Sequence, residues 1–137
     1  MNAAIEWVSE GTVTSPAGFL AGATYAGLKT YGQNKLDLGM LVSEHPSSAA
    51  GVFTTNVIRS ASVVLSQSRV ASGSARAVVV NSGCANACVG DQGMKDAVET
   101  TAIAAAQLGL PSRDVLFCST GVIGVELFPA SEGVDID

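Results

Sequence analysis

Two apolar runs, each leading into a small polar stretch with a glycine and separated by one long helical segment, constrain this chain most. The runs are Ala77–Val80, followed by Asn81-Ser82-Gly83, and Val115–Cys118, followed by Ser119-Thr120-Gly121. The first run contains no alternating polar residues, which is typical of a central strand covered on both faces. We therefore expect two buried strands that each end in a polar turn.

The segment between these strands is predicted to be a helix over Asp91–Leu108. Its apolar stripe, at helical spacing, consists of Met94, Ala97, Val98, Thr101, Ala105 and Leu108. Asp91 is expected to cap the start, and Gly109 and Pro111 supply a stop, with Leu110 folding back on the last turn. Strand, helix and strand in this order resemble a βαβ unit, so we expect a mixed fold, α/β or α+β.

The first half of the chain has the pattern of short strands divided by glycine-rich turns. Extended segments are expected at Thr12–Ser15, Ala23–Lys29, Leu36–Ser43, Gly51–Asn56 and Ala61–Gln67. A turn over residues 31–34 would join the second and third of these segments. No repeat period and no Pro- or Ser-rich linker divides the chain, which favours a single domain over residues 1–137.

Charge and composition exclude several classes of protein. The net charge is -5, from 12 acidic and 7 basic groups, so no basic patch for nucleic acid is expected. No run of 18 apolar residues occurs and the N-terminus has no basic signal region, so neither a membrane span nor secretion is expected. Three cysteines then indicate reduced thiols in a cytoplasmic protein. Because only 14% of residues are charged, part of the surface is expected to lie against a partner chain or against the remainder of a larger protein.

Metal, nucleophile and phosphate sites each compete with a plain packing explanation. Cys84, Cys88 and Cys118 have no common zinc spacing, which favours small buried thiols among alanines. Cys118 and the serines lack a base that the sequence places nearby, because His45 is the sole histidine. The stretch NSGCANACVGDQG precedes a helix and could hold phosphate, but tight glycine turns explain it equally well.

The Ser119-Thr120-Gly121 stretch allows a more specific interpretation. The Thr120 hydroxyl and the Gly121 amide are adjacent donors at the end of a rigid strand, and such a pair suits a developing oxyanion. An ordinary turn would use the same residues, so spacing alone leaves both interpretations open.

Five blocks, in order, resemble the bifunctional ornithine acetyltransferase / glutamate N-acetyltransferase family of arginine biosynthesis. The blocks are GFLAGATYAGLK, DLGMLVSE, AAGVFTTN, ARAVVVNSGCANACVGDQG and VLFCSTGVIG, and the similarity runs from about Val13 to Leu127. The resemblance implies a layered sheet-and-helix fold, shared with self-processing aminopeptidases. It also implies that this chain is the N-terminal part of the family's α chain, with residues 128–137 as an atypical tail.

The same resemblance implies an activity. A precursor cleaves itself before an internal threonine into α and β chains, which assemble as α2β2 in the cytoplasm. The new N-terminal threonine of the β chain takes the acetyl group from N-acetylornithine and passes it to glutamate. No metal or cofactor is implied, although some members also use acetyl-CoA as a substrate.

Thr120 and Gly121 would be the oxyanion hole of that enzyme, and the stretch from Asn81 would be scaffold near the same pocket. No nucleophile lies in this chain, so alone it is expected to be inactive. Two other classes remain open: a non-catalytic interaction module that keeps the fold, which substrate binding without a second chain would favour, and an aminopeptidase relative, which peptide hydrolysis would reveal.

Overall fold

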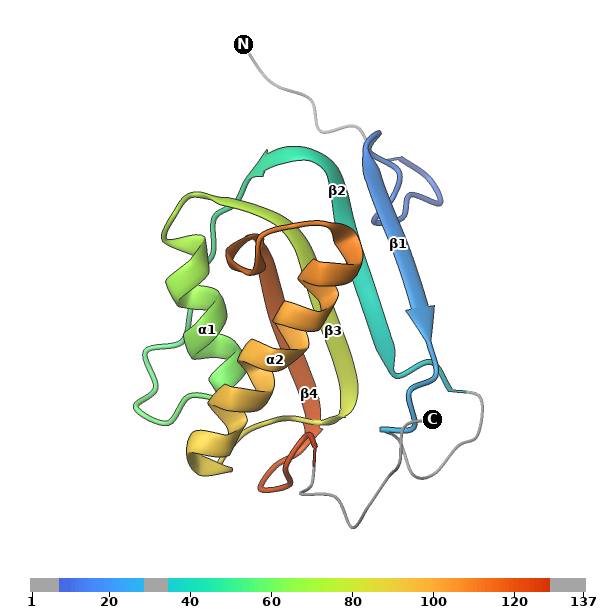
Figure 1. The fold of residues 1–137 in the computed structure, drawn as a ribbon. Coiled ribbons are helices and arrows are strands. Elements are labelled where there is room, and N and C mark those ends of the chain that lie inside the picture. Colours follow the sequence, from blue (N-terminus) through green and yellow to red (C-terminus); the bar gives the residue numbers. More distant parts are fainter. Residues whose placement is uncertain (1–7, 29–34, 129–137) are drawn as a thin grey trace.

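The computed structural model describes residues 8–28 and 35–128, which form a four-stranded sheet with two helices on one face (Figure 1). The elements are β1 (Phe19–Thr24), β2 (Leu38–Ser48), α1 (Ala61–Val70), β3 (Ser74–Cys84), α2 (Gly90–Leu108), the 3-10 turn η1 (Ser112–Asp114) and β4 (Val115–Val122). In the order β1-β2-β3-β4, the first three strands are antiparallel and β3 and β4 are parallel. The expected mixed α/β fold is confirmed.

Helix α2 is the crossover of a βαβ unit between β3 and β4, as predicted. It ends at Gly109, whose left-handed φ of 64° lets Leu110 turn back and donate its N–H to the Ala105 carbonyl at 2.9 Å. The prediction for its start is wrong, because Val89 is the N-cap residue and no side chain caps the helix. Asp91 lies in the first turn, where a negative charge still suits the helix dipole.

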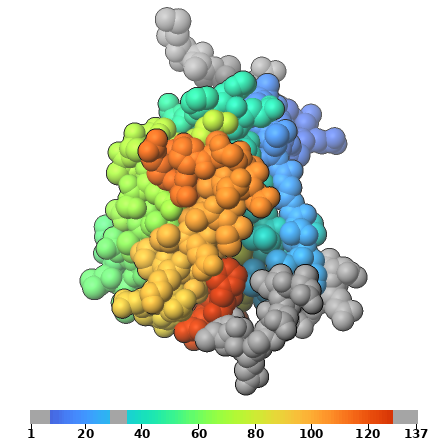
Figure 2. Space-filling view, viewed as in Figure 1, coloured from blue at the N-terminus to red at the C-terminus, as the bar shows by residue number. Residues whose placement is uncertain are grey.

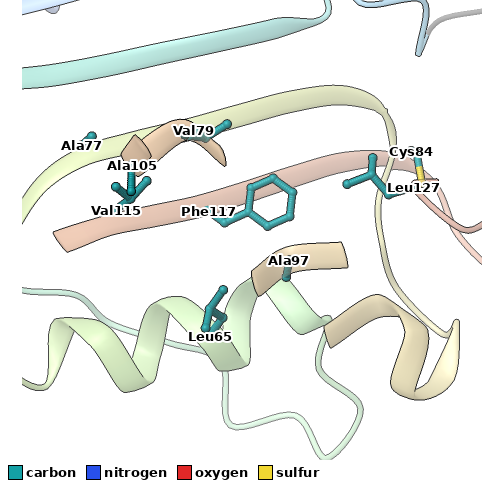
Figure 3. Packing of buried hydrophobic residues seen from close by; sticks show 10 residues of the cluster. Leu65, Ala77, Val79, Cys84, Ala97, Ala105, Val115, Phe117 and Leu127 are labelled. Atoms are coloured by element: carbon teal, nitrogen blue, oxygen red, sulfur yellow. The ribbon is translucent and has the colours of Figure 1, made fainter. Parts of the chain in front are cut away.

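The hydrophobic core lies between the sheet and the helices. Its members include Leu65 of α1, Ala97 and Ala105 of α2, and the strand residues Val79, Val115 and Phe117 (Figure 3). The buried core residues of α2 are all alanine, and these small side chains let the helix backbone lie close to the sheet. Among the described residues, Phe117 is the largest side chain that is fully buried, at 1% exposed.

The prediction of a strand over Ala61–Gln67 is wrong, because these residues begin helix α1. Ser60 caps the helix, and its hydroxyl accepts the Val63 N–H at 3.4 Å. Ser62, Leu65 and Ser66 are the buried residues of α1, and their spacing is that of one helix face. The N-cap and this buried face outweigh the strand preference of the β-branched residues in the run.

Other boundaries in the first half also differ from the predictions. Thr12–Ser15 forms a turn closed by the Ser15 N–H on the Thr12 carbonyl at 3.1 Å, and Gly51–Asn56 has no regular structure. The strand expected over Ala23–Lys29 is largely wrong, because within the described residues it overlaps β1 only at Ala23 and Thr24. The strand expected over Leu36–Ser43 corresponds to the first part of the longer β2, which pairs with β1. The predicted turn over residues 31–34 lies outside the described residues, as does the tail from residue 129.

The sheet face opposite the helices carries apolar side chains that no described helix covers. Successive residues of a strand point to opposite faces, so Val80 of β3 and Cys118 of β4 lie away from the core. Val80 is 40% exposed and Cys118 is exposed. β3 is therefore an interior strand as predicted, but the described residues cover only one of its faces. The expectation that Cys118 belongs to the core is wrong.

No helix in the described part of the chain is long and apolar enough to cross a membrane.

Candidate active site

The two polar stretches singled out from the sequence lie side by side at the carboxyl ends of β3 and β4. The parallel register pairs Asn81 with Ser119, Ser82 with Thr120 and Gly83 with Gly121. Both stretches were expected to be turns, and this is wrong, since each continues its strand. Ligand sites of α/β sheets commonly lie at this end of parallel strands, so the pairing brings the predicted donors to a suitable place.

Two glycines at the same register position let the strands approach closely. Gly83 has a φ of 134° and Gly121 a φ of 138°, values that residues with a side chain rarely adopt. A Cβ on Gly121 would lie 2.2 Å from the Gly83 carbonyl carbon and 2.6 Å from the Cys84 nitrogen. Position 121 therefore requires glycine for two reasons, the φ angle of the backbone and the lack of space for a Cβ beside the neighbouring strand.

The Thr120 side chain is exposed on the face of β4 opposite the helices. Val115 and Phe117 are buried against the helices, and the alternation of the strand places Thr120 on the other face. Within the described residues, nothing forms a hydrogen bond with the Thr120 hydroxyl. The hydroxyl can therefore donate to a ligand without giving up an internal bond.

The direction of the Gly121 N–H follows from the way helix α1 covers the outer edge of β4. The Ser66 hydroxyl accepts the Phe117 N–H at 3.0 Å and donates to the Phe117 carbonyl at 2.9 Å, and Arg69 donates to the Val115 carbonyl. Backbone groups of alternate residues point to the same edge of a strand. The Gly121 N–H, four residues after that of Phe117, is thus directed to this outer edge, away from β3.

The end of β4 lies at the surface of the molecule. Figure 2 shows the segment that follows β4, in red, at the surface beside the first turns of α2, in yellow and orange. The Thr120 hydroxyl and the Gly121 amide are adjacent in the chain, exposed and carried by a paired strand. Both groups are therefore available to donate hydrogen bonds to a ligand at this end of the sheet.

The cysteines differ from one another in exposure. Cys84 is buried, with its thiol donating to the Val125 carbonyl at 3.1 Å, whereas Cys88 and Cys118 are exposed. The expectation of three buried thiols is therefore wrong for two of them. Partial burial raises the pKa of the Cys118 thiol above its ordinary value, which disfavours its thiolate. Within the described residues, no three His, Cys, Asp or Glu side chains could hold a metal ion together.

His45 lies too far from the polar strand ends to act as their base. It is in β2 beyond the irregular pairing that follows Val42, whereas Leu38, at the other end of that strand, pairs with Asn81. Seven residues of strand separate His45 from Leu38, which is on the order of 20 Å. No base for a serine nucleophile is expected here from the sequence, and the fold does not bring this histidine close enough to be one.

The glycine-rich stretch before α2 packs onto the helix itself. Asn86 is fully buried with a φ of 48°, and its side-chain amide donates to the Gly93 carbonyl at 2.8 Å. A Cβ on Gly93 would lie 2.9 Å from the Asn86 Oδ1 and 2.7 Å from the Val89 side chain. Close packing therefore accounts for Gly93, the last glycine of this stretch.

The sequence analysis does not identify Ser66 and Arg69, which bind the edge of β4 at Phe117 and Val115. Both lie on α1, which was predicted to be a strand over much of its length. The sequence does contain a signal for this helix. Ser60 is a suitable N-cap, and the run after it has residues at helical spacings of three and four: Ser62, Leu65, Ser66 and Arg69. Without knowledge of the sheet, nothing in this run shows that two of its members meet an edge strand.

Comparisons with known proteins identify relatives over most of the chain. A family model described as "ArgJ family" matches residues 20–132. The arginine biosynthesis bifunctional protein ArgJ of Dehalococcoides mccartyi is 48% identical over 127 residues, covering 93% of this chain and 31% of that protein. Curated relatives of this kind are much longer, and the chain spans about 30% of their length.

Two solved structures share the fold. The arginine biosynthesis bifunctional protein ArgJ of Bacillus halodurans superposes with a TM-score of 0.82 at 40% identity, covering 88% of this chain and 62% of that one. The ornithine acetyltransferase of Mycobacterium tuberculosis, complexed with ornithine, gives a TM-score of 0.76 at 42% identity, covering 83% of this chain and 61% of that one. The layered sheet-and-helix fold implied by the sequence resemblance is thereby confirmed.

Proposed function

Because this chain belongs to the ArgJ family, we propose that it forms part of an acetyltransferase of arginine biosynthesis, with N-acetylornithine as acetyl donor and glutamate as acceptor. The relatives of known name and the solved ornithine acetyltransferase support this class of reaction. The enzyme acts in the cytoplasm, and acetyl-CoA is a second acetyl donor to be tested.

In this proposal Thr120 and Gly121 are the oxyanion hole. When a nucleophile adds to the acetyl carbonyl, the oxygen becomes an anion, and the Thr120 hydroxyl and the Gly121 N–H donate hydrogen bonds to it. The exposure of both residues and the outward direction of the Gly121 N–H support this role. Pairing of β4 with β3 holds the donors in place before the charge forms, which is what makes such donors effective.

The nucleophile is proposed to be an N-terminal threonine on a β chain that self-cleavage of a common precursor releases, with the two chains assembled as α2β2. Its hydroxyl adds to the acetyl carbonyl while its own α-amino group takes the proton. Collapse of the oxyanion expels ornithine, whose amine takes the proton, and leaves an acetyl ester on the threonine. The glutamate amine then attacks this ester through a second oxyanion, and the threonine α-amino group passes the proton of the attacking amine to the leaving threonine oxygen, which yields N-acetylglutamate and the free threonine.

The observation that carries the proposal is the exposed donor pair at the end of β4, in a chain that belongs to the ArgJ family. It is tested in a complete enzyme containing these residues. Thr120→Val keeps the shape of the side chain without its hydroxyl and is expected to lower kcat by about 10²-fold or more. Thr120→Ser retains the hydroxyl and should keep most of the activity.

An unchanged kcat in the Thr120→Val enzyme would remove Thr120 from the mechanism. The 137-residue chain assayed alone with N-acetylornithine and glutamate is expected to show no turnover, since the nucleophile is assigned to another chain. Turnover by this chain alone would contradict that assignment. Hydrolysis of aminoacyl anilides by the complete enzyme would instead point to an aminopeptidase.

A further inference from the structure

One backbone carbonyl, that of Cys84, accepts hydrogen bonds from side chains of both parallel strands. The Asn81 Nδ2 of β3 and the Ser119 Oγ of β4 each donate to it at 2.8 Å. Asn81 and Ser119 are register partners, so their side chains lie on the same face of the sheet and converge on one acceptor. The Cys84 carbonyl is therefore tied to β4 at the residue directly before Thr120.

The other end of the same peptide unit is tied to β4 beyond the candidate donors. The Ala85 N–H donates to the Val122 carbonyl at 2.9 Å. The peptide between Cys84 and Ala85 thus contacts β4 through Ser119 on one side and Val122 on the other. Thr120 and Gly121 lie between these two attachments, which leaves the peptide that joins them little freedom to move.

Contact between the backbones adds a third constraint on Gly121. Its α-carbon faces the peptide of Gly83 and Cys84 so closely that a Cβ there would lie 2.3 Å from the Gly83 oxygen and 2.6 Å from the Cys84 nitrogen. A shift of the Cys84 backbone would therefore be transmitted directly to Gly121. Backbone atoms of the two strands that lie this close leave no room between them to absorb such a shift.

The burial of Asn81 is not explained by stability alone. Its side chain is 1% exposed, and within the described part of the chain its Oδ1 accepts no hydrogen bond. A buried polar group without a partner costs folding free energy. The hydrogen bond that the Asn81 side chain makes within the described residues is the one to the Cys84 carbonyl, beside the donor pair.

We infer that Asn81 and Ser119 are positioning residues, which fix the Thr120–Gly121 peptide by jointly holding the Cys84 carbonyl. Neither side chain touches the reacting atoms in this inference. They act through the backbone, by keeping the two donors at the spacing that one oxyanion requires. The inference rests on the proposed role of Thr120 and Gly121.

The test measures kcat and KM in a complete enzyme carrying these residues. Ser119→Ala is expected to lower kcat about tenfold with KM changed less than about twofold, because misplaced donors weaken transition-state binding above all. Ser119→Thr keeps a hydroxyl at the same position and should restore most of kcat. Asn81→Ala, which removes the other donor to the Cys84 carbonyl, should likewise lower kcat while changing KM little.

Ser66→Ala is the matched control. It also removes a serine hydroxyl bonded to the β4 backbone, but at Phe117, outside the region flanked by Ser119 and Val122. Ser66→Ala should lower stability while leaving kcat within about twofold of the parent. A loss of kcat equal to that of Ser119→Ala would mean that any loosening of β4 slows the enzyme, and it would overturn the inference.

A double-mutant cycle separates this inference from the proposed function. If Ser119 acts through the donors, Ser119→Ala should cost clearly less in the Thr120→Val background than in the parent, since one donor is already gone. Equal fold losses in both backgrounds would overturn the positioning role while leaving the oxyanion hole intact. An unchanged kcat for Thr120→Val alone would refute the oxyanion hole itself, and the positioning inference with it.

Discussion

Replacement of Gly121 by alanine is the sharpest test of the geometry at the end of β4. The substitution adds a single methyl group, and it does so where the strand already has a φ of 138°. The added Cβ would lie 2.2 Å from the Gly83 carbonyl carbon, 2.3 Å from its oxygen and 2.6 Å from the Cys84 nitrogen. All three are backbone atoms of β3, so no side chain can turn aside to relieve the overlap.

The expected loss of stability follows from these distances. Ordinary contact begins at 3.4 Å, so β3 and β4 would have to separate locally by about 1.2 Å. That displacement would break the 2.9 Å bond between the Ala85 N–H and the Val122 carbonyl. Backbone strain of about 1–3 kcal/mol and one or two lost hydrogen bonds at about 1 kcal/mol each give a destabilisation of about 2–5 kcal/mol.

The measurement is urea unfolding of the purified chain, followed by circular dichroism. Gly73→Ala is the first control, because Gly73 also has a positive φ, 79°, but a Cβ there would meet nothing within 4 Å. It should cost about 1 kcal/mol. Gly22→Ala has neither feature and should change the free energy of unfolding by less than about 0.5 kcal/mol. A Gly121→Ala loss no larger than that of Gly73→Ala would refute the reasoning.

Two further predictions concern the core and the open face of the sheet. Ala97→Leu, at a position that is fully buried between α2 and the sheet, should lower the free energy of unfolding by about 1–3 kcal/mol. Ala106→Leu, on the exposed side of α2, is the control and should have little effect. Equal losses for the two variants would contradict the close helix–sheet packing. Burial raises the pKa of Cys118 in the folded chain above 9.0, the ordinary value for a thiol, so the unfolded chain loses this proton at lower pH than the folded chain. The free energy of unfolding should therefore keep its full value at neutral pH and fall as the pH rises above 9.0. Cys118→Ser should reduce this alkaline decline in urea unfolding, and an identical pH dependence would show that the thiol plays no part.

The βαβ unit could be predicted from the sequence because its signals are local. The helix has a periodic stripe and a glycine at its end, and Gly109 indeed takes the left-handed conformation that stops α2. The run from Ala77 to Val80 reads as a strand without reference to the rest of the chain. Such signals need only a short window of sequence, and here they identify three of the elements that build the site.

The predictions failed where distant residues decide the local structure. Gly83 and Gly121 were interpreted as turn residues, since glycine after an apolar run usually marks a turn. In the fold each glycine instead faces the other across two paired strands, and the pairing keeps both backbones extended. Position 83 contains nothing that indicates a partner 38 residues later, so the local signal for a turn was outweighed by tertiary pairing.

The starting point of α1 decides where the edge of β4 becomes accessible. The helix runs antiparallel to β4, so that Arg69 meets Val115 and Ser66 meets Phe117 (Figure 1). At about 1.5 Å per helical residue and 3.3 Å per strand residue, the five residues from Ser66 back to the helix start cover about two more residues of β4. The first residue of α1 therefore lies near Ser119, one residue short of the donor pair. An edge strand is normally covered to prevent unwanted pairing, and here the cover stops short of Gly121, whose N–H would face the oxyanion in the proposed function. Ser60, by capping the helix at this point, sets the boundary between the sealed part of the edge and the part that remains open.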